Sequence, residues 1–170
     1  QLYGDSTQAG TTAGAALTRT PAQWLQDDLD ALFGPGAVVV EDRSAPSTTL
    51  GQLLDGTDGR NGPWPASVHA DVVVVNHGIN DAGSGSSLDE YMARLDALFA
   101  APAQVVLETP NPVKSNNMAA YAAAMNLVAS RHGAVVADTF AYVAGLPTGG
   151  LGYLTDRAHP SEDLYRHIVR

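Results

Sequence analysis

The chain has 170 residues, of which 45% are hydrophobic and 6% aromatic, so it is long enough for one globular domain and too apolar for a disordered segment. Its net charge of −9, without a basic stripe, argues against nucleic acid or an anionic membrane surface as a partner. The absence of cysteine excludes disulfides, thiolate metal sites and a cysteine nucleophile, and no apolar run approaches the ~20 residues of a membrane span.

The predicted elements alternate between strand and helix along the chain. Apolar and β-branched runs predict strands, and capping patterns, such as a Ser or Thr three residues before a Glu or Gln, predict helix starts. In chain order we predict a strand at 1–3, a helix opening at Thr20, strands at 37–40 and 71–76, a helix opening at Ser87, a strand at 104–108, a helix from 115 or 116 to Gly133, a strand at 134–137 and a helix opening at Ser161.

Such alternation predicts right-handed βαβ units, and therefore an α/β fold with a five-stranded parallel sheet between two layers of helices. The Gly- and Pro-rich stretches at 55–65 and 148–152 are interpreted as surface loops, so residues 1–170 are expected to form a single domain. Trp64 in the first loop is interpreted as an anchoring aromatic residue, with substrate stacking as the alternative.

Three polar motifs stand where this fold places functional residues. They are Gly4-Asp5-Ser6 after the first strand, Gly78-Ile79-Asn80-Asp81 after the strand at 71–76, and Asp156-Arg157-Ala158-His159-Pro160 before the last helix. Because ligands of open α/β sheets bind beyond the carboxyl ends of the strands, the motifs are expected to meet at one rim. Each motif also has a purely structural alternative: Ser6 as a helix N-cap, Asn80 as a loop asparagine, and Asp156 with His159 as a loop capping pair.

Together the motifs supply what ester hydrolysis by a serine nucleophile requires. Ser6 at a strand-to-helix turn would have its own N–H and a positive helix end close to a developing oxyanion. Asn80 has a side-chain amide that can donate to that oxyanion. Asp156, three residues before His159, can accept the Nδ1–H and leave Nε2 to take the serine proton, while His77 is interpreted as a packing residue. No residues with metal-ligand spacing accompany them, so neither a metal nor another cofactor is expected.

With these motifs the chain resembles the SGNH, or GDSL-type, hydrolase family over nearly its whole length. The resemblance implies a flavodoxin-like three-layer α/β/α fold and hydrolysis of esters or thioesters. It implies Ser6 as nucleophile and first oxyanion donor, Asn80 as a further donor, His159 as general base and Asp156 as its orienting residue. Asp5 and Gly78 are placed near the substrate by the same resemblance, which also favours an extracellular or periplasmic location. The oligomeric state stays open.

The chain departs from the family pattern in two places. Thr7 follows the serine where the family name implies Leu. The family also has a Gly after its second strand whose N–H completes the oxyanion hole, and the best alignment puts Pro46, which has no N–H, at that position. Either the loop shifts so that Ser47 or Ala45 donates, or the hole has two donors. Arg43 in this loop is considered as a substrate contact, with a solvated surface role as the alternative.

The expected substrate is a small acyl ester on a small molecule or a glycan. The chain has no apolar lid, and family members of this size include carbohydrate esterases that remove acetyl groups. A lysophospholipase or thioesterase is one alternative. Another is a catalytically weak carbohydrate-binding module, which Pro46 favours. A flavodoxin-type nucleotide binder is disfavoured because residues 4–10 lack a glycine-rich phosphate cradle.

Overall fold

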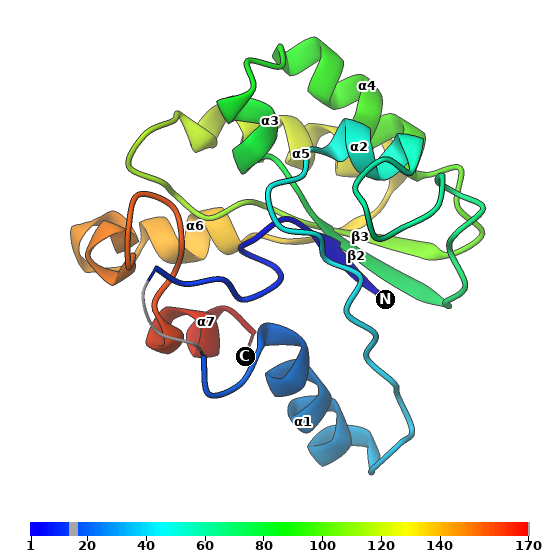
Figure 1. Cartoon of the computed structure of the whole chain (residues 1–170), viewed down its shortest axis with the longest axis horizontal. Helices are drawn as coiled ribbons and strands as arrows, with labels where there is room; N and C mark the ends of the chain where they lie inside the picture. Colours follow the sequence, from blue (N-terminus) through cyan, green and yellow to red (C-terminus); the bar gives the residue numbers. More distant parts are fainter. Residues whose placement is uncertain (14–16, 170) are drawn as a thin grey trace.

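A computed structural model describes residues 1–13 and 17–169 and contains a parallel sheet of four strands (Figure 1). The strands are β1 (Leu2–Gly4), β2 (Val72–Asn76), β3 (Gln104–Glu108) and β4 (Val135–Ala137), and they lie side by side in that order. Tyr3 pairs with Val75, Val75 with Leu107, and Leu107 with Val136, so the carboxyl ends of all four strands reach the same edge.

The predicted strand at residues 37–40 is not part of the sheet, so the sheet has four strands and not the predicted five. Val39 is 77% exposed, and the side-chain amide of Gln26 hydrogen bonds to the backbone on either side of it. The chain reaches the sheet only at residues 41–45, which form three backbone hydrogen bonds with β1. The prediction was wrong because the backbone of the apolar run pairs with a helix side chain, while the polar segment after it lies along the sheet edge.

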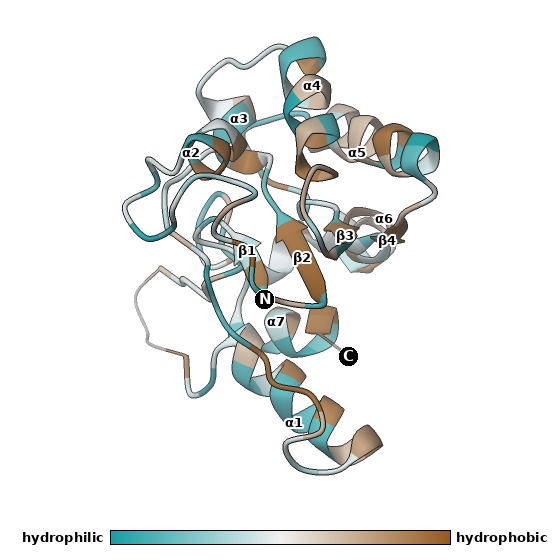
Figure 2. Ribbon diagram, turned by 90° about the vertical axis from the view of Figure 1, so that its right-hand side faces the viewer, coloured by the Kyte–Doolittle hydropathy of each residue, from teal (hydrophilic) through white to brown (hydrophobic). Residues whose placement is uncertain are grey.

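Helices form a layer on each side of the sheet. Helices α2 to α5 lie together on one side, and α1 and α7 lie on the other (Figures 1 and 2). The helices are α1 (Pro21–Phe33), α2 (Leu50–Asp55), α3 (Ile79–Gly83), α4 (Leu88–Leu98), α5 (Met118–His132), α6 (Thr139–Ala144), the 3-10 segment η1 (Pro147–Tyr153) and α7 (Glu162–Val169). The capping boxes predicted at Thr20 and Ser87 are both formed, whereas the short helices α2, α3 and α6 were not predicted.

The larger core lies between the sheet and α2, α4 and α5. Val73 and Val75, two residues apart on β2, are fully buried there, as the two-residue period of a strand requires, and so are their neighbours Tyr3 and Leu107 on the adjacent strands. Trp64 belongs to this core, with its ring centroid 5.3 Å from that of Tyr3 and its Nε1–H donating to the Leu98 carbonyl. Substrate stacking by Trp64 is therefore excluded, because a buried, hydrogen-bonded indole is not accessible to a ligand.

Candidate active site

Three segments that are distant in the sequence meet at the carboxyl ends of the strands. Ser6 lies in the turn after β1, Asn80 in the first turn of α3, and His159 in the loop before α7. The Nε2 atom of His159 lies 2.9 Å from the Ser6 Oγ atom, and its Nδ1 atom lies 2.7 Å from Oδ2 of Asp156. One imidazole thus bridges a carboxylate and a hydroxyl, as proton removal from a serine requires.

The Asp156 carboxylate is held by the turn that carries the histidine. Its Oδ1 atom accepts the backbone N–H groups of Ala158 and His159, each at 2.8 Å. Desolvation opposes ionisation, but these hydrogen bonds and the imidazole outweigh it and lower the pKa of Asp156 to about 2. An ionised Asp156 accepts the Nδ1–H, so Nε2 is left as an acceptor for the Ser6 hydroxyl.

Ser6 does not stand at the start of a helix, contrary to the prediction. Residues 5–11 form tight turns, closed by bonds such as that from the Ala9 N–H to the Asp5 carbonyl at 3.0 Å. The next helix, α1, begins only at Pro21. Because a helix dipole arises from many aligned peptides, it does not act on Ser6 here.

The buried carboxylate of Asp5 organises the loop around the serine. Its Oδ1 atom accepts both the N–H and the hydroxyl of Thr7 at 2.9 Å, and its Oδ2 atom accepts the side-chain amide of Asn80 at 3.2 Å. Burial raises the pKa of Asp5 to about 6. Gly4 precedes it because a Cβ there would lie 2.7 Å from a carbonyl oxygen of β2. With 1% of its surface exposed, Asp5 holds neighbouring residues in place and is not a substrate contact.

The turn at residues 45–48 places a glycine-like backbone at Ser47. The φ angle of Ser47 is 64°, and a proline followed by a left-handed residue is typical of a type II turn. The left-handed position is thus one residue after Pro46, where the alignment had put the family glycine. The N–H of Ala45 is bonded to a β1 carbonyl at 2.9 Å, whereas those of Ser6 and Ser47 form no hydrogen bond within the described part of the chain.

Asn80 joins this turn to the nucleophile loop. Its Nδ2 group donates to the Thr48 carbonyl at 3.0 Å and to the Asp5 carboxylate at 3.2 Å, so both amide hydrogens have acceptors. Gly78, just before α3, has a φ angle of 145°, and a Cβ there would lie 3.0 Å from the Tyr91 hydroxyl. Gly78 is therefore required by the backbone and presents no side chain to a substrate.

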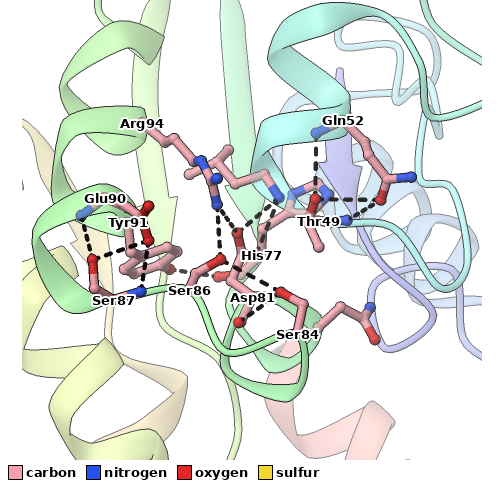
Figure 3. A network of polar contacts seen from close by, with 12 residues as sticks. Thr49, Gln52, His77, Asp81, Ser84, Ser86, Ser87, Glu90, Tyr91 and Arg94 are labelled. Atoms are coloured by element: carbon pink, nitrogen blue, oxygen red, sulfur yellow. Dashed lines mark hydrogen bonds and ion pairs between the residues drawn. The ribbon is translucent and has the colours of Figure 1, made fainter.

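A buried carboxylate next to Asn80 ties two helices together (Figure 3). Asp81 is fully buried, and its Oδ2 atom accepts the N–H of Leu50, the first residue of α2, at 3.0 Å. Arg94 of α4 lies 3.3 Å from Oδ1 of Asp81 and donates to the Ser86 hydroxyl at 2.9 Å. Because α2 follows the turn at 45–48, Asp81 fixes that turn relative to α3. The position of Asp81 in its motif was the only sequence signal for this role.

The other histidine of the region, His77, is a packing residue. It is 2% exposed, and burial lowers its pKa to about 4. Its Nε2 atom lies 3.4 Å from the hydroxyl of Thr48. His77 is thus neutral near pH 7 and bonded inside the fold, which agrees with the interpretation of the sequence.

Arg43 is not brought to the serine. Its guanidinium is paired with Glu41, and its N–H donates to the Leu2 carbonyl at the opposite end of β1 from Ser6. These contacts favour the surface role that was the alternative for Arg43, because segment 41–45 runs parallel to β1 and only its last residues reach the rim.

The bridged serine and histidine lie on an open rim. The His159 and Asp156 side chains are 23% and 35% exposed. A separate cavity of about 200 Å³ lies between the sheet and helices α1 and α7, and its wall includes Glu108 and Asn76. Glu108 accepts the Thr139 hydroxyl at 3.0 Å, and burial raises its pKa to about 7. The described residues contain no group of three or more His, Asp or Glu arranged to hold a metal ion.

The model of the GDSL-like lipase/acylhydrolase family matches residues 2–167. The chain belongs to this family. Its members are acylhydrolases, so the protein is a carboxylic ester hydrolase. The family resemblance inferred from the three motifs is thereby confirmed. A search of curated proteins gives no match.

Solved structures of family esterases share the fold. A lipase/acylhydrolase from Enterococcus faecalis superimposes with a TM-score of 0.83 at 20% identity, over 99% of this chain and 89% of that one. A tryptophan-to-isoleucine mutant of Axe2, an acetyl xylan esterase from Geobacillus stearothermophilus, superimposes with a TM-score of 0.74 at 23% identity, over 99% of this chain and 89% of that one. No helix among the described residues has the length and apolar character needed to cross a membrane.

Proposed function

We propose that this GDSL-family esterase cleaves small acyl esters, acetyl esters foremost, through Ser6, His159 and Asp156. The observation that carries the proposal is the single imidazole that lies 2.9 Å from the Ser6 Oγ atom and 2.7 Å from the Asp156 carboxylate. In the first step, Nε2 of His159 takes the hydroxyl proton while Oγ attacks the ester carbonyl, and the proton then passes to the leaving alcohol. Water, activated by the same imidazole, hydrolyses the acyl-enzyme.

Three donors are proposed for the oxyanion. The backbone N–H groups of Ser6 and Ser47 have no other acceptor among the described residues, which leaves them available. The amide of Asn80 must give up one of its two hydrogen bonds in order to donate to the oxyanion. We expect it to give up the longer one, to Asp5 at 3.2 Å. Ser47 then takes the place of the family glycine, so the hole does not depend on Pro46.

An acetyl substrate on a carbohydrate fits an open rim without an apolar lid. The superimposed Geobacillus structures are of an acetylxylan esterase, and three are catalytic mutants at a serine, an aspartate and a histidine, the last two three positions apart. The spacing of Asp156 and His159 is the same. An O-acetylated saccharide is accordingly the proposed natural substrate, and a lysophospholipase or thioesterase is the second candidate within the family.

The test compares hydrolysis of 4-nitrophenyl esters by wild type and Ser6→Ala. We expect kcat to fall by at least about 10³-fold, because removal of a triad member leaves only binding and oxyanion stabilisation. Ser130→Ala, an exposed serine on α5, is the matched control and should keep full activity. Equal turnover by wild type and Ser6→Ala would refute the assignment.

The acyl group is tested with the same chromophore and acyl chains from two to eight carbons. We expect kcat/KM to be highest for acetate and to decline beyond a few carbons. Rates that rise with chain length would instead support the lysophospholipase or thioesterase alternative.

A further inference from the structure

Among the described residues, two basic side chains take part in no ion pair. The described residues include eight Lys and Arg side chains, and six of them are paired with a carboxylate. Lys114 and Arg157 are the two that form no ion pair or side-chain hydrogen bond with a described residue, and both are exposed. An exposed cation without an ion pair is ordinary in itself, because surface ion pairs are weak. These two are distinguished by where they lie.

The two free cations lie on loops that are joined to each other. The N–H of Lys114 donates to the Arg157 carbonyl at 2.8 Å, and the side-chain amide of Asn111 donates to the Ala158 carbonyl at 3.1 Å. The backbones at Lys114 and Arg157 are therefore in direct contact, and their long side chains can reach a common ligand.

Arg157 also belongs to the turn that holds the reacting imidazole. It follows Asp156, and the next two residues, Ala158 and His159, each donate a backbone N–H to Oδ1 of Asp156 at 2.8 Å. Any ester whose carbonyl reaches Ser6 must therefore pass within a few residues of this pair.

We propose that Lys114 and Arg157 form a cationic rim that binds an anionic group, a carboxylate or a phosphate, on the alcohol portion of the ester. The inference rests on the proposed function and narrows its substrate to anionic esters. A guanidinium matches the two oxygens of either group in a bidentate pair, and an ammonium adds a mobile point charge. The rim also offsets the repulsion that a protein of net charge −9 exerts on an anionic substrate.

The test compares three acetyl esters that differ in charge: O-acetylated glucose, O-acetylated glucuronate and O-acetylated glucose 6-phosphate. For wild type we expect kcat/KM to be at least about 10-fold higher for an anionic ester at low salt. Because Coulomb attraction between exposed groups is screened, the preference should shrink in 0.5 M NaCl, roughly the range where the Debye length falls below 5 Å. The two anionic esters distinguish a carboxylate from a phosphate as the bound group.

Two variants with the same change in net charge complete the design. The double variant Lys114→Gln and Arg157→Gln should lose the preference, so that its kcat/KM values for the neutral and the anionic esters become similar. The control Arg131→Glu, on α5, should keep the preference. If wild type prefers the neutral ester, or if the double variant keeps the anionic preference, the cationic rim is refuted.

Binding separates this inference from the proposed mechanism. The same three esters are titrated against Ser6→Ala by calorimetry, so that no turnover is needed. Tighter binding of an anionic ester, lost when Lys114→Gln and Arg157→Gln are added, supports the rim even if the nucleophile assignment fails. Equal binding of all three esters overturns it even if ester hydrolysis is observed.

Discussion

At the scale of single residues, the backbone N–H of Ser47 is the proposed oxyanion donor in place of the N–H of the family glycine. Its φ of 64° is a conformation that costs non-glycine residues about 1–2 kcal/mol. We therefore expect Ser47→Gly to keep kcat and to change the free energy of unfolding by less than about 1 kcal/mol, since relieved strain and greater unfolded-state entropy oppose each other. Steady-state kinetics and denaturant unfolding measure the two quantities.

The companion variants Ser47→Ala and Ser47→Val separate the backbone from the side chain. If the N–H is the donor, Ala should stay close to wild type. Val should lose about 10²-fold or more in kcat, because a β-branched residue resists a left-handed φ and misplaces the donor. If kcat instead fell in both Ser47→Gly and Ser47→Ala, and fell no further in Ser47→Val, the role would belong to the Ser47 hydroxyl.

Asp81 is the residue through which the elements around the oxyanion donors are held. It accepts the first N–H of α2 and is paired with Arg94 of α4, so its loss frees α2 and the turn before it from α3. We expect Asp81→Ala to lower kcat about 10- to 100-fold with KM within about two-fold, because misplaced donors weaken transition-state more than ground-state binding.

A purely structural role of Asp81 is separated by two further measurements. Removing one partner of a buried pair also destabilises a protein by about 3–5 kcal/mol, so kinetics are recorded where circular dichroism shows the variant folded. Arg94→Lys keeps the charge and should restore most of the kcat lost in Arg94→Ala. An unchanged kcat in folded Asp81→Ala would show that α2 keeps its place without the carboxylate.

The order of the elements was predictable where local signals and burial agree. The capping boxes at Thr20 and Ser87 and the β-branched run at 71–76 carry their own evidence, and each became the expected element. The run at 37–40 failed because sheet pairing depends on a distant partner, here Gln26. In the site, the three motifs identified the residues that meet. The left-handed φ of Ser47 was not predictable, because it depends on the exact position of the turn, which sequence spacing alone does not determine. Its one local signal is the proline before it.

At the scale of the whole molecule, buried ionisable groups shape how stability depends on pH. Burial raises the pKa of Asp5 to about 6 and that of Glu108 to about 7, so between pH 4 and 7 these two groups hold protons in the folded protein that they have lost in the unfolded chain. Burial also lowers the pKa of His77 from 6.5 to about 4, which acts in the opposite sense but offsets only one of the two groups. The free energy of unfolding must therefore fall as pH rises through that interval. Asp156, with a pKa of about 2, acts in the opposite sense and loses its contribution as pH falls below about 4.

We accordingly expect maximal stability near pH 4–5 and test it by denaturant unfolding at pH 4.5, 6 and 8. Glu108→Gln removes one of the two raised groups, so its free energy of unfolding should match that of wild type at pH 4.5. At pH 8 it should exceed the wild-type value by on the order of 3 kcal/mol, since the pKa of Glu108 is raised from 4.5 to about 7 and each pKa unit corresponds to about 1.4 kcal/mol. Asp89→Asn, at an exposed carboxylate on α4, should leave the profile unchanged. If the difference between Glu108→Gln and wild type were the same at pH 4.5 and pH 8, Glu108 would ionise in the folded protein as readily as in the unfolded chain.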